Sequence, residues 1–220
     1  MDTSFSNRLF LLPLFQGFSR LDFLDIVEKT PFAFKTLLPG DTLVRQDEIC
    51  ESLCMILRGD IETDLTSLDG TYHFIENFTA PCVVQPERIF GFDTRYSCTV
   101  RALTEVQTVL LDKQSVRLLL QQYPVFQINF YNMICTTAQN AIQKLWMIRS
   151  SSLYDRFKHF VQLRSLSPVG MKTIRIRMDD LAQELCTTRL RVSRLLAEMS
   201  ASGLLAYSRG AIYIHALEKL

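Results

Sequence analysis

Several features that mark common protein classes are missing from this sequence of 220 residues. No apolar stretch approaches the roughly 20 residues that a membrane-spanning helix needs, and the N-terminus lacks the basic region and cleavable apolar segment of a secretory signal. No Gly-rich phosphate loop, nucleophile elbow or zincin motif occurs in the sequence. We therefore expect a cytoplasmic protein without a membrane partner, and not an enzyme of a class that these motifs define.

Cysteine and histidine, which often bind transition metals, are few and scattered. The six cysteines include no C-x-x-C pair, so we expect free thiols and no structural metal site. Histidine occurs three times, at His73, His159 and His215, with no H-x-H spacing. A metal-dependent enzyme built on a β-barrel is an alternative, but it would need several histidines and carboxylates that converge in the barrel.

Charge is distributed unevenly along the chain, although the net charge is only +1. Residues 1–148 contain 12 basic and 17 acidic residues, whereas residues 149–220 contain 12 basic and 6 acidic residues. The net charge is therefore −5 in the first part and +6 in the second. This asymmetry favours a C-terminal region that meets a polyanion, and the alternative is two ordinary solvated surfaces.

The N-terminal half alternates short β-prone runs with turn signals. After short helices between about residues 7 and 29, runs such as LVRQ, LCMILRG and CTVRAL lie between residues 31 and 111. Turn signals separate the runs at Pro39–Asp41, Arg58–Asp60 and Asp69–Gly70. Several short strands at close spacing predict a sandwich or a barrel.

A long helix is predicted from about Pro124 to Arg149, after a shorter helix that Asp112 precedes. Apolar side chains recur along the long helix at intervals of 3 and 4 residues, which places them on one seam. The members of this seam are Tyr131, Ile134, Ala138, Ala141, Leu145 and Ile148. The seam predicts either self-association of two copies or packing of the helix on its own barrel.

The most informative segment covers residues 178–199, where two helical periodicities break near Cys186. The side chains expected to point inward are Leu181, Ala182, Leu185, Val192, Leu195 and Leu196. A helix at 153–163 and a strand at 173–177 come before this helix pair, and two alternating runs around Ser208–Gly210 predict a β-hairpin after it. Strand, helix, turn, helix and hairpin in this order predict a winged helix-turn-helix.

Polar and basic side chains of this region supply the chemistry for double-stranded DNA. Arginine can donate two hydrogen bonds to guanine O6 and N7 or bind phosphate, and hydroxyl groups can reach phosphates or base edges. Thr187 or Thr188 can cap the second helix. The predicted DNA-binding residues are Arg177, Thr188, Arg189, Arg191, Ser193, Arg194 and, at the hairpin tip, Arg209. A solvated helix face is the alternative for the arginines, but the order of elements in a basic region favours DNA.

The segment LAQELCTTRLRVSRLLAEMSASGLL resembles the helix-turn-helix of the Crp/Fnr family of bacterial transcription regulators, in which T-x-x-x-V-S-R-x-L precedes a G-L-I-like run. Arg189 and Arg194 match the two arginines typical of that recognition helix. Leu190 stands where many members carry a glutamate that accepts a hydrogen bond from cytosine. Cys186 replaces a small turn residue, often glycine. Because Leu190 cannot accept that hydrogen bond, the resemblance implies an operator half-site that differs from the one read by members with the glutamate.

The same resemblance implies an α+β fold in three parts. These are a cyclic-nucleotide-binding-type β-barrel (jelly roll) with N-terminal helices at residues 1–123, a dimerisation helix at 124–149, and a winged helix-turn-helix at 150–220. A homodimer would read a pseudo-palindromic operator with recognition helices about 34 Å apart, under control of an unknown small-molecule effector and with RNA polymerase as a partner. The alternative is a ligand-independent or protein-regulated DNA binder with a degenerate barrel.

The effector-binding segment departs from the pattern of cyclic-AMP-binding members. Those members cradle ribose and phosphate with G-E-L-x-x-L and a following R-S, and YSCTVRA here aligns with their R-S-A-x-V-R-A. Tyr96 then replaces the phosphate-binding arginine, Gln85 and Pro86 replace Gly-Glu, Ser97 is retained, and Arg95 lies one place away, where its side chain would face the other way. The candidate effector-binding residues are Arg95, Tyr96 and Ser97, and we expect an effector other than cyclic AMP.

The resemblance also bears on two other cofactors of the family, an iron–sulfur cluster and haem. An iron–sulfur cluster like that of Fnr is not expected, because no group of cysteines lies near the N-terminus. Haem stays open, since a haem-sensing member would use one or two histidines as axial ligands. His159 lies on the predicted linking helix and His215 in the predicted wing strand, which leaves His73 as the candidate ligand.

Overall fold

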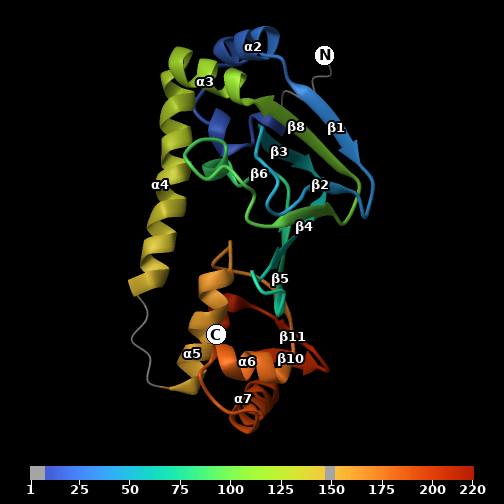
Figure 1. The fold of residues 1–220 in the computed structure, drawn as a ribbon. Helices are drawn as coiled ribbons and strands as arrows, with labels where there is room; N and C mark the ends of the chain where they lie inside the picture. The colour runs from blue at the N-terminus through green and yellow to red at the C-terminus, as the bar shows by residue number, and fades with distance from the viewer. Residues whose placement is uncertain (1–7, 147–151) are drawn as a thin grey trace. The chain divides into compact units, whose positions relative to one another are not determined.

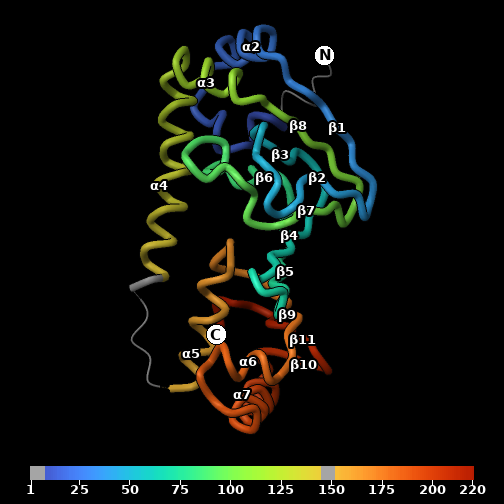
Figure 2. Tube along the Cα trace, viewed as in Figure 1, coloured from blue at the N-terminus to red at the C-terminus, as the bar shows by residue number. Residues whose placement is uncertain are grey.

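The computed structural model describes residues 8–146 and 152–220, and the chain folds into two compact units (Figures 1 and 2). The first unit combines the residues up to Ile61 with Phe78–Gln139, and the second combines Glu62–Asn77 with Asn140–Leu220. No helix in the described ranges is long and apolar enough to cross a membrane. The division means that the chain passes from one unit to the other more than once.

Two sets of hydrogen-bonded strands form the framework of the first unit. One sheet has the order β1-β8-β3-β6, and β2 pairs with β7. The strands are β1 (Ala33–Leu37), β2 (Thr42–Val44), β3 (Ser52–Arg58), β6 (Cys82–Val84), β7 (Thr99–Ala102) and β8 (Val106–Asp112). Strand β4 (Asp60–Thr66) begins in this unit, and its residues from Glu62 onward belong to the second unit. Strand β3 is buried along residues 53–57 because it lies inside its sheet, between β8 and β6. The predicted jelly-roll barrel is confirmed.

The turn between β3 and β4 requires a glycine. Gly59 has a φ of +96°, and a Cβ atom at this position would lie 2.4 Å from the carbonyl oxygen of Glu105. Both the left-handed backbone and the close approach exclude residues with a side chain. The turn signal at Arg58–Asp60 thus marks a tight connection at the edge of the barrel.

Helices cover the N- and C-terminal parts of the first unit. They are α2 (Arg20–Lys29), α3 (Lys113–Gln122) and α4 (Pro124–Trp146). Asp112, which was predicted to precede this helix, caps α3 by accepting a hydrogen bond from the backbone N–H of Ser115. Helix α4 begins at Pro124 and buries Phe126 and Phe130. The side chain of Leu145 and all of Ile148, both in the predicted seam, lie outside the described residues.

The second unit contains the predicted winged helix-turn-helix. Its elements are α5 (Leu153–Arg164), β9 (Lys172–Ile176), α6 (Met178–Glu184), α7 (Arg189–Ala201), β10 (Leu205–Ser208) and β11 (Ala211–Ile214). All six side chains that the sequence placed inward in the helix pair are buried. Arg209 and Gly210 connect β10 to β11, so Arg209 lies at the tip of the wing as predicted. His215 follows β11, so its assignment to the wing strand was wrong by one residue.

A strand from the first half of the sequence completes the sheet of the second unit. Strand β5 (Tyr72–Thr79) pairs antiparallel with β9, from Tyr72 opposite Ile176 to Glu76 opposite Lys172. Tyr72 and Phe74 are buried in the core that also contains Phe157 and Ile174. Within this unit the strand order is therefore β10-β11-β9-β5-β4. Residues 62–77 thus belong to the unit of the winged helix-turn-helix, whereas a contiguous domain at 1–123 was predicted.

A buried ion pair fixes β5 against β9. The side chains of Glu76 and Lys172 are each 2% exposed, and Glu76 Oε1 lies 2.6 Å from Lys172 Nζ. Glu76 also accepts hydrogen bonds from the backbone N–H groups of Leu166 and Ser167, and Lys172 also donates to the carbonyl oxygen of Val169. Because an isolated buried charge is costly, each of these residues depends on the other.

We expect Glu76→Ala to lower the free energy of unfolding by about 3–5 kcal/mol, because it leaves the Lys172 ammonium buried without its carboxylate. Urea unfolding followed by circular dichroism measures this loss. The double variant Glu76→Leu/Lys172→Met is the matched control and should recover part of the loss, because apolar side chains replace both charges while the hydrogen bonds to Leu166, Ser167 and Val169 stay lost. A loss below about 1 kcal/mol for Glu76→Ala, the range of an exposed pair, would contradict the role of the pair.

Candidate nucleic-acid interface

Helix α7 exposes three arginines to solvent, while its apolar side chains are buried. Arg189, Arg191 and Arg194 are exposed, while Val192 and Leu196 are fully buried. The buried side chains pack into the core of the unit, so the orientation of the helix fixes which side the arginines occupy. The structure therefore places these three predicted DNA-binding residues where a polyanion can reach them.

The turn between α6 and α7 has an unusual backbone at Cys186. This residue has a φ of +46°, in the left-handed region that favours glycine. The turn is closed by hydrogen bonds from Cys186 N to the carbonyl oxygen of Gln183 and from Thr187 N to that of Ala182, at 3.0 and 2.9 Å. This conformation explains why a small residue is ordinary at this place in a helix-turn-helix.

The start of α7 lacks the side-chain cap that the sequence predicted. Thr188 is the N-cap residue, but its hydroxyl makes no capping hydrogen bond. The hydroxyl of Thr187 is buried and has no hydrogen-bond partner in the part of the chain that is described. The prediction was right in naming Thr188 as an N-cap residue and wrong in its capping hydrogen bond. The exposed Thr188 hydroxyl and the first N–H groups of α7 are instead placed to bind a phosphate group.

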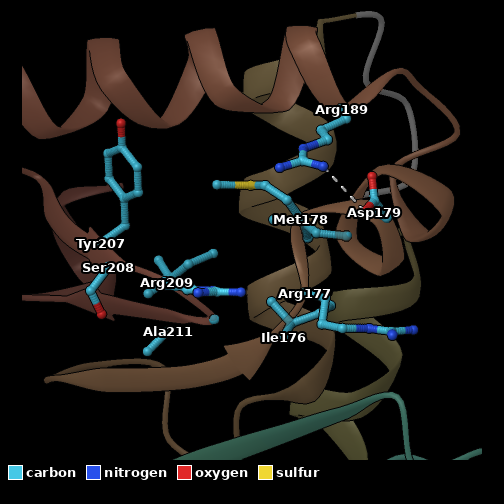
Figure 3. Close-up of a pocket in the computed structure, with 12 residues that line it drawn as sticks. Ile176, Arg177, Met178, Asp179, Arg189, Tyr207, Ser208, Arg209 and Ala211 are labelled. Carbon is cyan, nitrogen blue, oxygen red and sulfur yellow. Dashed lines mark ion pairs between the residues drawn. The ribbon is translucent and has the colours of Figure 1, made fainter.

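A cavity of about 510 Å³ lies between the first turns of α6 and α7 and the wing (Figure 3). Three of the predicted DNA-binding residues, Arg177, Arg189 and Arg209, line it. Further lining residues that the sequence did not single out are Met178, Asp179, Tyr207 and Ser208. Arg191, Ser193 and Arg194 lie on α7 but do not line the cavity. The predicted set thus forms one cluster around the cavity and a second group along the helix.

Two aspartates in the first turn of α6 bind two different arginines. Asp180 accepts two hydrogen bonds from Arg177, at 2.7 and 3.0 Å, and these bonds hold the pKa of Asp180 below its usual value. Asp179 Oδ2 lies 3.5 Å from Arg189 Nη1. Acidic residues are ordinary in the first turn of any helix, so the sequence carried no signal that Asp179 would meet an arginine of the next helix.

In the segment predicted to bind an effector, the side chain of Gln85 binds Ser97, one of the candidate effector-binding residues. Gln85 is 7% exposed, and its Oε1 accepts hydrogen bonds from the backbone N–H and the hydroxyl of Ser97, at 2.8 and 2.9 Å. Its Nε2 donates to Cys98 Sγ. The two donors of Ser97 that face Gln85 are thus already satisfied within the chain.

The other two candidate effector-binding residues point elsewhere. Tyr96 is 4% exposed, and its hydroxyl donates to the carbonyl oxygen of Ser52; burial raises the pKa of Tyr96. Arg95 donates to the carbonyl oxygen of Asp47 on the exposed side of the unit. Arg95, Tyr96 and Ser97 therefore do not converge on one ligand-sized space.

His73, the candidate haem ligand, lies on β5, with Nδ1 3.0 Å from Asp64 Oδ1. A second cavity, of about 540 Å³, lies in the first unit beside α4, between residues such as Pro86 and Asn129. The residues that line this cavity and the one at the wing include no histidine. Haem therefore stays a prediction from the resemblance to the family.

Comparisons with known proteins agree with this geometry. Residues 34–123 match the family model of the cyclic nucleotide-binding domain, and residues 157–220 match that of the Crp-like helix-turn-helix domain. No curated protein matches the sequence. The fold is similar to that of the catabolite activator protein of Thermus thermophilus, with a TM-score of 0.57, 17% identity and coverage of 92% of this chain and 93% of that one. It is also similar to the c-di-GMP responsive global regulator CLP of Xanthomonas campestris, with a TM-score of 0.54, 13% identity and coverage of 87% and 97%.

Proposed function

Because the chain belongs to the Crp/Fnr family of DNA-binding transcription regulators, we propose that it binds a pseudo-palindromic operator as a homodimer, under control of an effector other than cyclic AMP. The family points to a regulator and not to an enzyme. The observation that carries the proposal is that Arg177, Arg189 and Arg209, from three different elements, line one cavity.

We propose different tasks for these arginines. Arg189 lies at the start of α7, the end of a recognition helix that contacts base edges, so its guanidinium can read guanine in the major groove. Arg209 at the tip of the wing and Arg177 at the start of α6 lie on the flanks, where phosphates pass. Arg191 and Arg194 extend the basic surface along α7. The arrangement supports base reading by one element and backbone contacts by its neighbours.

The homodimer is supported by an exposed apolar stripe on α4. Ile128, Tyr131 and Ile142 are 54%, 49% and 53% exposed, and Cys135 and Ala138 lie exposed between them, at intervals of 3 and 4 residues. The stripe shares Tyr131 and Ala138 with the predicted seam but is rotated from it, since Ile134 is partly buried. A helix of 23 residues with Lys144 as its one charged residue can approach its own copy without like-charge repulsion.

The effector proposal is supported by the contact between Gln85 and Ser97. The amide oxygen of Gln85 takes the two hydrogen bonds that a bound anion would otherwise accept from Ser97. No arginine replaces Tyr96 in this place, because Arg95 is directed to Asp47. The same contact favours the alternative that the protein binds DNA without any small-molecule ligand.

Selection of random duplex DNA by the purified protein tests the proposed function. We expect recovery of an inverted repeat whose half-sites are centred one helical turn, about 34 Å, apart, because two identical winged domains must meet two half-sites. A variant with Arg177, Arg189 and Arg209 all replaced by alanine is the control and should enrich no motif. Enrichment of a single unrepeated motif by the wild type would contradict the homodimer, and no enrichment with or without cell extract as a source of effector would contradict DNA reading.

Oxidative cross-linking tests the α4 stripe in the dimer. Residues on the seam of a parallel twofold helix pair meet their own counterparts, so we expect diamide to join two chains through Cys135. The background is Cys82→Ser/Cys186→Ser, in which the other three cysteines are buried. The matched control combines Cys135→Ser with Thr136→Cys, which moves the thiol off the stripe and should remove most of the covalent dimer on a non-reducing gel. Equal cross-linking by both variants, or none by either at a concentration where light scattering shows a dimer, would contradict this interface.

Cyclic AMP is expected to leave the thermal stability of the protein unchanged. A ligand present at a hundred times its Kd would stabilise the folded state by about 2.7 kcal/mol, which a thermal shift assay detects. A catabolite activator protein measured alongside serves as the positive control. A saturable rise in the melting temperature with cyclic AMP would refute the reading of Gln85 as an occupant of the site.

A further inference from the structure

We propose that Asp179 is a positioning residue that orients Arg189 toward a guanine in the operator, an inference that rests on the proposed DNA-binding function. In Figure 3 a dashed line joins the guanidinium of Arg189 to the Asp179 carboxylate, and 3.5 Å separates Nη1 from Oδ2. The two side chains are 68% and 66% exposed, so the pair lies at the surface that DNA would cover.

The pair joins the first turns of two different helices. Asp179 is the second residue of α6, and Arg189 is the first residue of α7. Each helix is held by a fully buried side chain, Leu181 on α6 and Val192 on α7. The neighbouring Asp180 is already bound to Arg177 through two hydrogen bonds. Each aspartate therefore holds a different arginine, and the one held by Asp179 is the one at the reading end of α7.

The chemistry of the guanidinium allows it to bind Asp179 and a base together. Arginine has five N–H donors in a planar fork, and guanine O6 and N7 need two of them. Asp179 approaches Nη1, which leaves donors on the other nitrogens free for a base edge. A guanidinium already held in one direction also loses less side-chain freedom when it binds.

The carboxylate has a second effect on DNA that carries no guanine at this position. The charge of Asp179 repels the phosphate backbone, and such repulsion weakens binding to every sequence. At the correct sequence, the guanine contact of the oriented Arg189 offsets the repulsion. Asp179 should therefore increase the ratio between affinity for the operator and affinity for random DNA.

The test measures both affinities for a set of variants, by fluorescence anisotropy at one fixed salt concentration. We expect Asp179→Asn to bind random duplex more tightly than the wild type and to lower the operator-to-random ratio about tenfold, the size of one weakened base contact. In an Arg189→Ala background, Asp179→Asn should change both affinities equally and leave the ratio unchanged. Glu198→Gln is the matched control, because it removes one negative charge from an exposed site of α7 nine positions after Arg189; it should leave the ratio at the wild-type value.

The outcomes separate this inference from its premise. A wild-type ratio near one would refute the proposed function itself. A large wild-type ratio that Asp179→Asn leaves unchanged or raises would overturn the positioning role alone. A loss of ratio that persists in the Arg189→Ala background would also overturn it, because Asp179 would then act without Arg189.

Discussion

The buried ion pair between Glu76 and Lys172 ties a strand from the first half of the chain to the winged helix-turn-helix. Its two side chains are 2% exposed, and neither charge could remain buried without the other. Strand β5 thereby becomes the fourth strand of the β10-β11-β9 sheet, and Tyr72 and Phe74 enter the core that also holds α7. Residues 72–76 lie within the match to the cyclic nucleotide-binding domain. The unit that contains α7 therefore includes a segment of the sequence that matches the cyclic nucleotide-binding domain.

The core of the second unit determines which side chains α6 and α7 expose. The two helices are held by buried side chains, Leu181 on α6 and Val192 and Leu196 on α7. One cavity is therefore lined by Arg177, Arg189 and Arg209, although these residues are far apart in the sequence. Asp179 and Asp180 lie among these arginines. A surface of this kind combines attraction to any polyanion with selective direction of single guanidinium groups, which is the combination that base reading requires.

The sequence predicted what local patterns determine. The periodicity of the two helices, the cap at Asp112 and the turn residues of the wing led to elements at the correct places. Contacts between distant residues carried no such signal. Lys172, the partner of Glu76, lies 96 positions away in the sequence. The ion pair between Asp179 and Arg189 depends on the angle between two helices. The exposed face of α4 depends on the direction in which Phe126 and Phe130 are buried. Gln85 was noted as a departure, but its hydrogen bonds to Ser97 needed the fold.

The affinity of the wild-type protein for its selected operator, divided by its affinity for a random duplex at the same physiological salt, tests the central claim most directly. A regulator that reads bases should bind the operator about a thousandfold to ten-million-fold more tightly. We expect a ratio in this range for the dimer. A ratio near one, with affinity that depends on salt alone, would show that the arginines contact only the phosphate backbone and would contradict the account.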